Sequence, residues 1–192
     1  MITIFGIDPA LNNVGYGVLR YDENNNTISD ISYGIFDIRT KASTEVKLNT
    51  IFTTTQALID KYQVDELAFE KAFHNPKRAK GGFLVRETLG AIKVAAVQKR
   101  VPIFGYTPQI VKKSIFGKGN ANKEQVAVAI AEALKIKTFT FSIRFRGKLT
   151  TVSLSPTEII KKYDHVTDGL AIAYCRLLEY QNAAKGEVIR VV

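Results

Sequence analysis

The order of the strand-like and helix-like segments restricts the fold of this chain more than any other feature. Three apolar, β-prone segments come first, at about residues 2–7, 15–21 and 27–36, with turn residues between them. From residue 45 onward, helix-like and strand-like patterns alternate. A meander followed by β/α units predicts an α/β fold, in which helices flank a mixed five-stranded sheet.

The alternating part supplies the remaining strands and the helices. Apolar residues between turn signals predict two further strands, at about residues 64–69 and 101–106. Apolar positions at helical spacing predict five helices, at about residues 45–62, 81–100, 107–116, 123–136 and from Asp164 to 181. No linker or internal repeat interrupts these elements, so we expect a single domain over residues 1–192.

Residues 138–154 depart from this alternation. Apolar and polar side chains alternate along "TFTFSIRFRGKLTTVSL" with a period of two, which predicts a β-hairpin that turns near Gly147 and is inserted before the last helix. Its apolar face would carry Phe139, Phe141, Ile143 and Phe145. The role of the hairpin stays open between an elaborated sheet edge, a dimer contact and an added grip on a polyanion by Arg144, Arg146 and Lys148.

Basic residues gather in the middle of the chain. The formal net charge is +9, and the stretch from Lys71 to Lys123 contains twelve lysine and arginine residues but one acid, Glu87. Such a concentration favours a polyanion partner, most simply nucleic acid, over a solvated face of mixed sign. We expect no membrane span and no secretion signal, and the lone Cys175 lies in an apolar pattern typical of a buried thiol.

Three acidic residues stand at the ends of elements that should pack together. Asp8 closes the first strand, Glu70 closes the fourth, and Asp168 lies in the first turn of the last helix. His165 precedes Asp168 by three residues, so both side chains would share one helix face. If the first and fourth strands are neighbours, Asp8 and Glu70 project from the same sheet edge, and the last helix would complete a four-ligand cluster.

The proximity of these carboxylates would itself favour a metal ion. Carboxylates held this close repel one another, and one of them would take up a proton at neutral pH unless a cation sat among them. Oxygen-rich sites suit Mg²⁺ or Mn²⁺, and two such ions about 4 Å apart can activate water and stabilise the leaving oxygen in phosphodiester cleavage. Simpler interpretations exist for each residue: Asp8 can start a turn, Glu70 can pair with Lys71, and Asp164 and Asp168 can act as helix-end residues.

Four segments carry these residues in a fixed order. They are "GIDPALNNVGYGVL", with Asp8; "LAFEKAFHN", with Glu70 and Phe73; the basic "YTPQIVKKSIFGKGNANKEQV"; and "HVTDGLAIA", with His165 and Asp168. In this order they resemble the motifs of the RuvC-like Holliday junction resolvases of the RNase H-like superfamily, and the resemblance covers most of the chain. Ala10 stands where the family usually has a glycine, and the first ligand of the closing motif is an acid in some members and a histidine in others.

The resemblance implies an RNase H-like endonuclease that acts in DNA recombination and repair. As a homodimer it would bind a four-way junction and make paired symmetric nicks that leave 5′-phosphate ends. Asp8, Glu70, His165 and Asp168 would hold two Mg²⁺ ions, or Mn²⁺ in their place, while Lys123, and also Lys112, would stabilise charge on the phosphate. The residues expected to contact DNA are Phe73, Lys77, Arg78, Lys80, Lys112, Lys113, Lys118 and Lys123.

Individual residues sharpen this expectation. An exposed Phe73 in a loop with turn chemistry could stack on an unpaired base at a junction centre. The imidazole of His165 is a softer ligand than a carboxylate, which favours Mn²⁺ as a hypothesis, and Asp164 could replace His165 because it is spaced four residues from Asp168.

Alternative functions and settings stay open at this point. One alternative is an RNase H-like nuclease that acts on flaps, other branched DNA or RNA:DNA hybrids, and another is a non-catalytic junction-binding protein. We expect a cytoplasmic protein, with a branch-migration helicase as a partner if a cell encodes it and the host cytoplasm as its location if a virus does.

Overall fold

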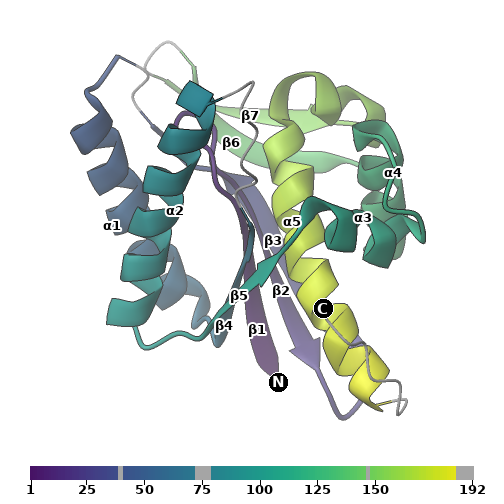
Figure 1. The fold of residues 1–192 in the computed structure, drawn as a ribbon. Helices are drawn as coiled ribbons and strands as arrows, with labels where there is room; N and C mark the ends of the chain where they lie inside the picture. Colours follow the sequence, from purple (N-terminus) through teal and green to yellow (C-terminus); the bar gives the residue numbers. More distant parts are fainter. Residues whose placement is uncertain (39–40, 72–78, 146–147, 185–192) are drawn as a thin grey trace.

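A mixed five-stranded sheet forms the centre of the fold. The computed structural model describes residues 1–38, 41–71, 79–145 and 148–184, and of these only the backbone at 79–81, 145 and 184. The strands have the order β3-β2-β1-β4-β5, with β1, β2 and β3 as an antiparallel meander and β4 and β5 added in parallel beside β1 (Figure 1). Their bounds are β1 Ile2–Asp8, β2 Gly15–Asp22, β3 Thr27–Ile35, β4 Glu66–Glu70 and β5 Ile103–Tyr106. The predicted sheet is confirmed.

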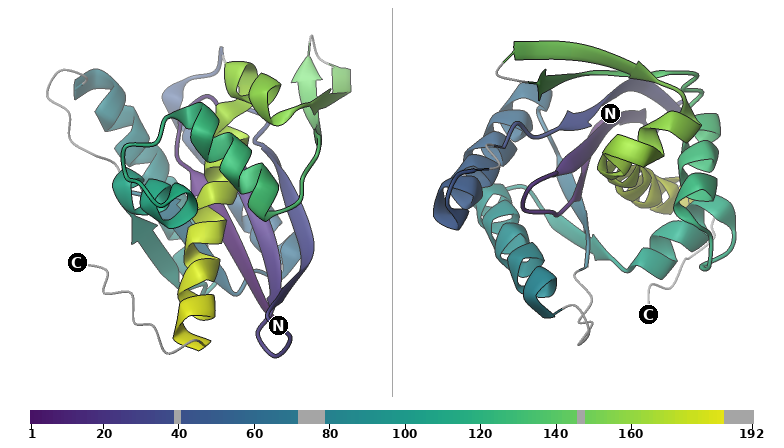
Figure 2. Two further views of the ribbon diagram at one scale, coloured as in Figure 1. Left: turned by 90° about the vertical axis from the view of Figure 1, so that its right-hand side faces the viewer. Right: turned by 90° about the horizontal axis from the view of Figure 1, so that it is seen from above.

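Helices cover both faces of this sheet (Figure 2). On one face lie α1 and α2, and on the other lies α5, with α3 and α4 beside it. Side chains of β1 alternate between two cores, Phe5 toward α1 and α2 and Ile4 toward α5, which explains why β1 is apolar almost throughout. Within the described ranges, no helix has the length and hydropathy that crossing a membrane requires. The bounds are α1 Thr44–Tyr62, α2 Ala79–Gln98, α3 Pro108–Phe116, α4 Lys123–Ala133 and α5 Pro156–Ala184.

A helical segment that the sequence did not predict precedes the last helix. α5 spans Pro156–Ala184, but its backbone breaks at Tyr163, where φ is −140° and ψ is 37°, so the part after the break begins at Asp164, where the last helix was predicted. The missed signal is a capping box: the hydroxyl of Ser155 accepts from the amide of Glu158 at 3.3 Å, and the carboxylate of Glu158 accepts from the amide of Ser155 at 2.9 Å. The sequence analysis missed this first part because its apolar pattern is weak.

The predicted β-hairpin is present as a separate two-stranded antiparallel sheet, β6 Phe139–Phe145 and β7 Lys148–Leu154. Its apolar face packs on the main body, because the ring of Tyr33 in β3 lies 5.4 Å from that of Phe139. The ring of Phe141 lies 5.4 Å from that of Tyr163, at the break in α5. The predicted turn at Gly147, with Arg146, lies outside the described residues, as does the side chain of Phe145.

Glycines let α5 lie directly against β1 and β2. A Cβ atom added at Gly15 would lie 2.0 Å from the carbonyl oxygen of His165, and one added at Gly6 would lie 2.3 Å from that of Gly169. A Cβ at Gly169 would in turn meet the Cα of Tyr16 at 2.6 Å. All of these neighbours are backbone atoms, so any larger residue would push the helix away from the sheet.

Replacing Gly15 with alanine should therefore displace α5. We expect the free energy of unfolding, measured by chemical denaturation, to fall by about 1–3 kcal/mol because the new methyl group meets backbone on the facing helix. Gly90→Ala in α2 is the matched control, since nothing lies within 4 Å of its Cβ position and alanine stabilises a helix interior by about 1 kcal/mol. Equal unfolding free energies for the two variants would contradict the tight contact.

Candidate metal centre

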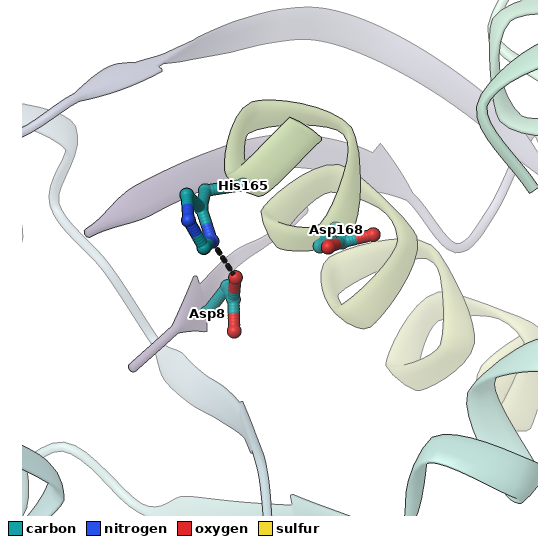
Figure 3. A group of neighbouring side chains, drawn as sticks. All are labelled: Asp8, His165 and Asp168. Carbon is teal, nitrogen blue, oxygen red and sulfur yellow. Dashed lines mark hydrogen bonds and ion pairs between the residues drawn. The ribbon is translucent and has the colours of Figure 1, made fainter. Parts of the chain in front are cut away.

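Asp8, His165 and Asp168 come together at one end of the sheet (Figure 3). Asp8 is the last residue of β1, and the other two lie on α5 just after its break. One potential ligand atom from each residue lies within 4.8 Å of the others. Nδ1 of His165 lies 2.5 Å from Oδ2 of Asp8. The predicted meeting of these three side chains is thus observed.

Glu70 lies in the wall of the same pocket but outside this group of three. β4 runs parallel to β1, with Phe69 paired to Ile7, so Glu70 ends its strand beside the end of β1. The pocket has a volume of about 530 Å³ and is lined by Asp8, Glu70, His165 and Asp168 among others. The four expected ligands therefore share one pocket, although the carboxyl group of Glu70 is not within the 4.8 Å set.

Burial and mutual repulsion change the protonation of these acids. Burial, followed by the charges of Asp8 and Asp168, raises the pKa of Glu70 to about 7. The pKa of Asp168 is likewise raised to about 7, by burial first and by the charge of Asp8 second. The bond to Asp8 raises the pKa of His165, which favours its cationic form. Negative charge is thus in excess among these side chains unless a cation is present.

Lysines stand at the rim of this pocket. Lys123 is the first residue of α4, and its backbone is fixed by a capping box between Asn122 and Gln125. Its ammonium group is bonded to Oδ2 of Asp164 and lies 3.5 Å from Oδ2 of Asp168. Burial alone would lower the pKa of Lys123, but these two carboxylates raise it. Lys112 of α3 and Lys71, which follows β4, also line the pocket.

The predicted DNA-contacting residues have different outcomes. Lys112 and Lys123 line the pocket as expected. Lys113 and Lys118 are exposed but do not belong to its lining. Outside the described residues lie Phe73, Lys77 and Arg78, together with the side chain of Lys80.

The sequence analysis missed two features of this pocket. One is Lys71 in its lining, and the other is the contact between Asp164 and Lys123. Lys71 directly follows Glu70, and this adjacency could have identified it. Asp164, expected to cap a helix, instead binds Lys123 and accepts a hydrogen bond from the amide of His165 at 3.1 Å. No local pattern links Asp164 to a lysine 41 residues away. The predicted burial of Cys175 is confirmed, and burial raises the pKa of its thiol to about 11.

The side chains of this pocket fit a divalent metal ion of the harder kind. Carboxylate oxygens with one imidazole nitrogen suit Mg²⁺ or Mn²⁺ better than thiophilic metals. The raised pKa values of Glu70 and Asp168 are the second observation: burial, and after it the charges of neighbouring acids, disfavours their ionised forms, and a bound cation would favour those forms. The pocket is accordingly a candidate metal centre.

The metal-free protein should be more stable at mildly acidic pH. With pKa values of about 7 for Glu70 and Asp168 in the fold, against ordinary values near 4, the folded state binds more protons than the unfolded chain. This contribution is complete below about pH 4 and is lost as the pH rises through about 7. We expect chelator-treated protein to melt several degrees higher at pH 6 than at pH 8.

Replacement of Asp168 with asparagine provides the control for this pH effect. The variant should melt above the wild-type protein at pH 8 in chelator, and the difference should shrink toward pH 5, where the native carboxyl group is protonated. A variant that melts below the wild-type protein at pH 8 would contradict the excess of negative charge.

Comparison with known proteins identifies the family. The family model for crossover junction endodeoxyribonuclease RuvC matches residues 4–143. The RuvC proteins of Halothermothrix orenii and Pseudothermotoga lettingae are 32% and 29% identical, over 94% and 90% of this chain and 94% and 91% of their own. Thermus thermophilus RuvC, solved in complex with a Holliday junction substrate, has a TM-score of 0.70 at 23% identity over 97% of both chains, which confirms the RNase H-like fold. This chain therefore belongs to the RuvC family of crossover junction endodeoxyribonucleases.

Proposed function

We propose that this chain is a metal-dependent endodeoxyribonuclease that resolves Holliday junctions by paired symmetric nicks. The observation that carries the proposal is the meeting of Asp8, His165 and Asp168 within 4.8 Å, in a pocket whose rim holds Lys71, Lys112 and Lys123. Acids that can hold cations, beside lysines that can bind phosphate, are the requirements of phosphodiester hydrolysis. The relatives' name, crossover junction endodeoxyribonuclease, supports the substrate.

Asp8, Glu70, His165 and Asp168 would hold two Mg²⁺ ions, with Mn²⁺ as a substitute. When bound, such ions supply an activated water and stabilise the negative charge on the leaving oxygen. The protein's part is to hold its ligands on the ends of two paired strands and one helix, which limits their movement. To act as a ligand, His165 would need one unprotonated ring nitrogen, because a cationic imidazole cannot bind a metal.

The basic side chains would bind and orient the DNA backbone. Lys123 and Lys112 at the rim can donate to non-bridging phosphate oxygens, where negative charge grows during cleavage. Lys113 and Lys118 would extend this surface, together with Lys77, Arg78 and Lys80, and Phe73 would stack at the junction centre. These contacts read shape and charge more than base sequence.

A homodimer would supply the two active sites that paired nicks require. α2 supports this proposal because it exposes large apolar side chains on one face: Phe83 is 61%, Val94 53% and Val97 64% exposed. Positions separated by 11 and 14 residues lie on the same side of an α-helix. A symmetric pair of such faces can bury them in a self-complementary interface. We also propose a cytoplasmic location, where a branch-migration helicase would act on the same junctions.

Asp8→Asn should separate junction binding from cleavage. The variant loses a metal ligand and a negative charge, so incision of an end-labelled four-way junction should disappear on denaturing gels while affinity in native gels stays equal or rises. Asp30→Asn, which removes an exposed charge on β3, is the control and should cleave normally. Flaps, duplex and RNA:DNA hybrid in parallel lanes test the choice of substrate. Incision at a near-normal rate by Asp8→Asn would refute the metal assignment.

Val94→Glu should weaken the dimer by burying charge in the apolar face of α2. We expect sedimentation equilibrium to show a shift from dimer to monomer relative to the wild-type protein. Val46→Glu makes the same change at a side chain that is 52% exposed on α1, and should leave the association unchanged. A wild-type protein that is monomeric at micromolar concentration, with or without junction DNA, would contradict the homodimer.

A further inference from the structure

Asp164 connects two functional side chains of the pocket without belonging to the group of potential metal ligands. Its Oδ2 atom is bonded to the ammonium group of Lys123. Its Oδ1 atom accepts a hydrogen bond from the amide of His165 at 3.1 Å and lies 3.8 Å from Nε2 of the same residue. Because each oxygen has its own partner, the carboxylate is held in one orientation.

The backbone around Asp164 is also held from both sides. The break in α5 falls at Tyr163, the residue before it, and the ring of Tyr163 packs edge-on against Phe141 of the hairpin. The hydroxyl of Thr167 donates to the carbonyl oxygen of Asp164 at 2.7 Å. Asp164 thus occupies a fixed point at the entrance to the second part of α5.

Lys123 has two anions within reach of its ammonium group. Its backbone is fixed by the capping box of α4, while its side chain is 57% exposed and can turn. The ammonium group is bonded to Asp164 and stands 3.5 Å from Asp168, one of the proposed metal ligands. Which carboxylate holds Lys123 therefore decides whether Asp168 is available to a metal ion.

We propose that Asp164 is a positioning residue, which holds Lys123 at the rim of the pocket and keeps it from pairing fully with Asp168. The inference rests on the proposed function, which assigns Asp168 as a metal ligand and Lys123 as a residue that acts on the phosphate. Without the charge of Asp164, the nearest remaining anion for Lys123 is Asp168. An ammonium group bound to a ligand carboxylate competes with a metal ion for it.

The test is a titration of Mn²⁺ alone, without DNA, into the whole protein by isothermal calorimetry. We expect Asp164→Asn to weaken Mn²⁺ binding about two- to fivefold, the range set by a partly exposed ion pair. Asp164→Glu keeps the charge and should retain the wild-type affinity. In a Lys123→Met background, which keeps the aliphatic stem but removes the competitor, Asp164→Asn should weaken binding clearly less than it does beside Lys123.

Single-turnover cleavage at saturating Mn²⁺ provides the second readout. Asp164→Asn should lower the rate constant several-fold at saturating junction and leave the junction Kd unchanged, since Lys123 is displaced from the phosphate but its charge remains. Asp164→Glu should restore the rate. Thermal melts of every variant establish folding, and Asp164→Ser replaces Asp164→Asn if the latter does not fold.

The outcomes separate this inference from the proposed function. A wild-type protein that binds no Mn²⁺ overturns the metal centre and the inference with it. A wild-type protein that binds Mn²⁺, with an Asp164→Asn variant that binds it equally well, overturns only the inference. The inference is also overturned if Asp164→Asn lowers the Mn²⁺ affinity equally in the wild-type and the Lys123→Met backgrounds. Asp164 would then act as a ligand or as a distant charge, and not through Lys123.

Discussion

The close contact of α5 with β1 and β2 is the constraint on which the site depends. At Gly6, Gly15 and Gly169 no side chain separates helix and strand, so their backbones approach directly at these points. The carbonyl of His165 itself forms one of these contacts, at Gly15, which is paired to Asp8 across the strands. The same packing that buries the core therefore fixes the distance between Asp8 on β1 and the two candidate ligands on α5, His165 and Asp168.

Charge compensation is the second organising feature of the pocket. Asp8, Asp164 and Asp168 lie close together, beside the ammonium group of Lys123 and the imidazole of His165. Burial first, and the charges of neighbouring acids second, raise the pKa of Glu70 and that of Asp168 to about 7. A cation in this pocket would favour the ionised forms of these acids, and under the proposed function the lysines at its rim would bind the phosphate of the substrate.

Contacts outside the pocket fix the positions of α4 and α5, the helices that carry Lys123, His165 and Asp168. The capping box at Asn122 fixes the first turn of α4 and hence Lys123. At the far end of α5, Arg176 bonds to Glu66 of β4 at 2.7 Å and stacks 3.7 Å from the ring centroid of Phe104, which ties that end of the helix to the sheet. The hairpin meets the break in α5 through Phe141 and Tyr163. Contacts at several points along this long helix limit its movement, and with it the movement of His165 and Asp168.

The sequence by itself determined the type and order of the elements, and it indicated the residues of the candidate metal centre. Periodicity of apolar residues is local information, and it was sufficient for the five-stranded sheet, the hairpin and the motif acids at strand ends. The early start of α5 was also encoded, in the Ser155 to Glu158 capping box, but only a weak apolar pattern accompanied it.

Only the tertiary structure decided which of these residues touch. Asp8, His165 and Asp168 meet, while Glu70 lies in the pocket wall. This arrangement follows from how closely α5 approaches β1, and glycine contacts between segments far apart in the chain set that distance. The bond of Asp164 to Lys123 has the same origin. Contacts between distant residues depend on the packing of whole elements, and no local pattern carries that information.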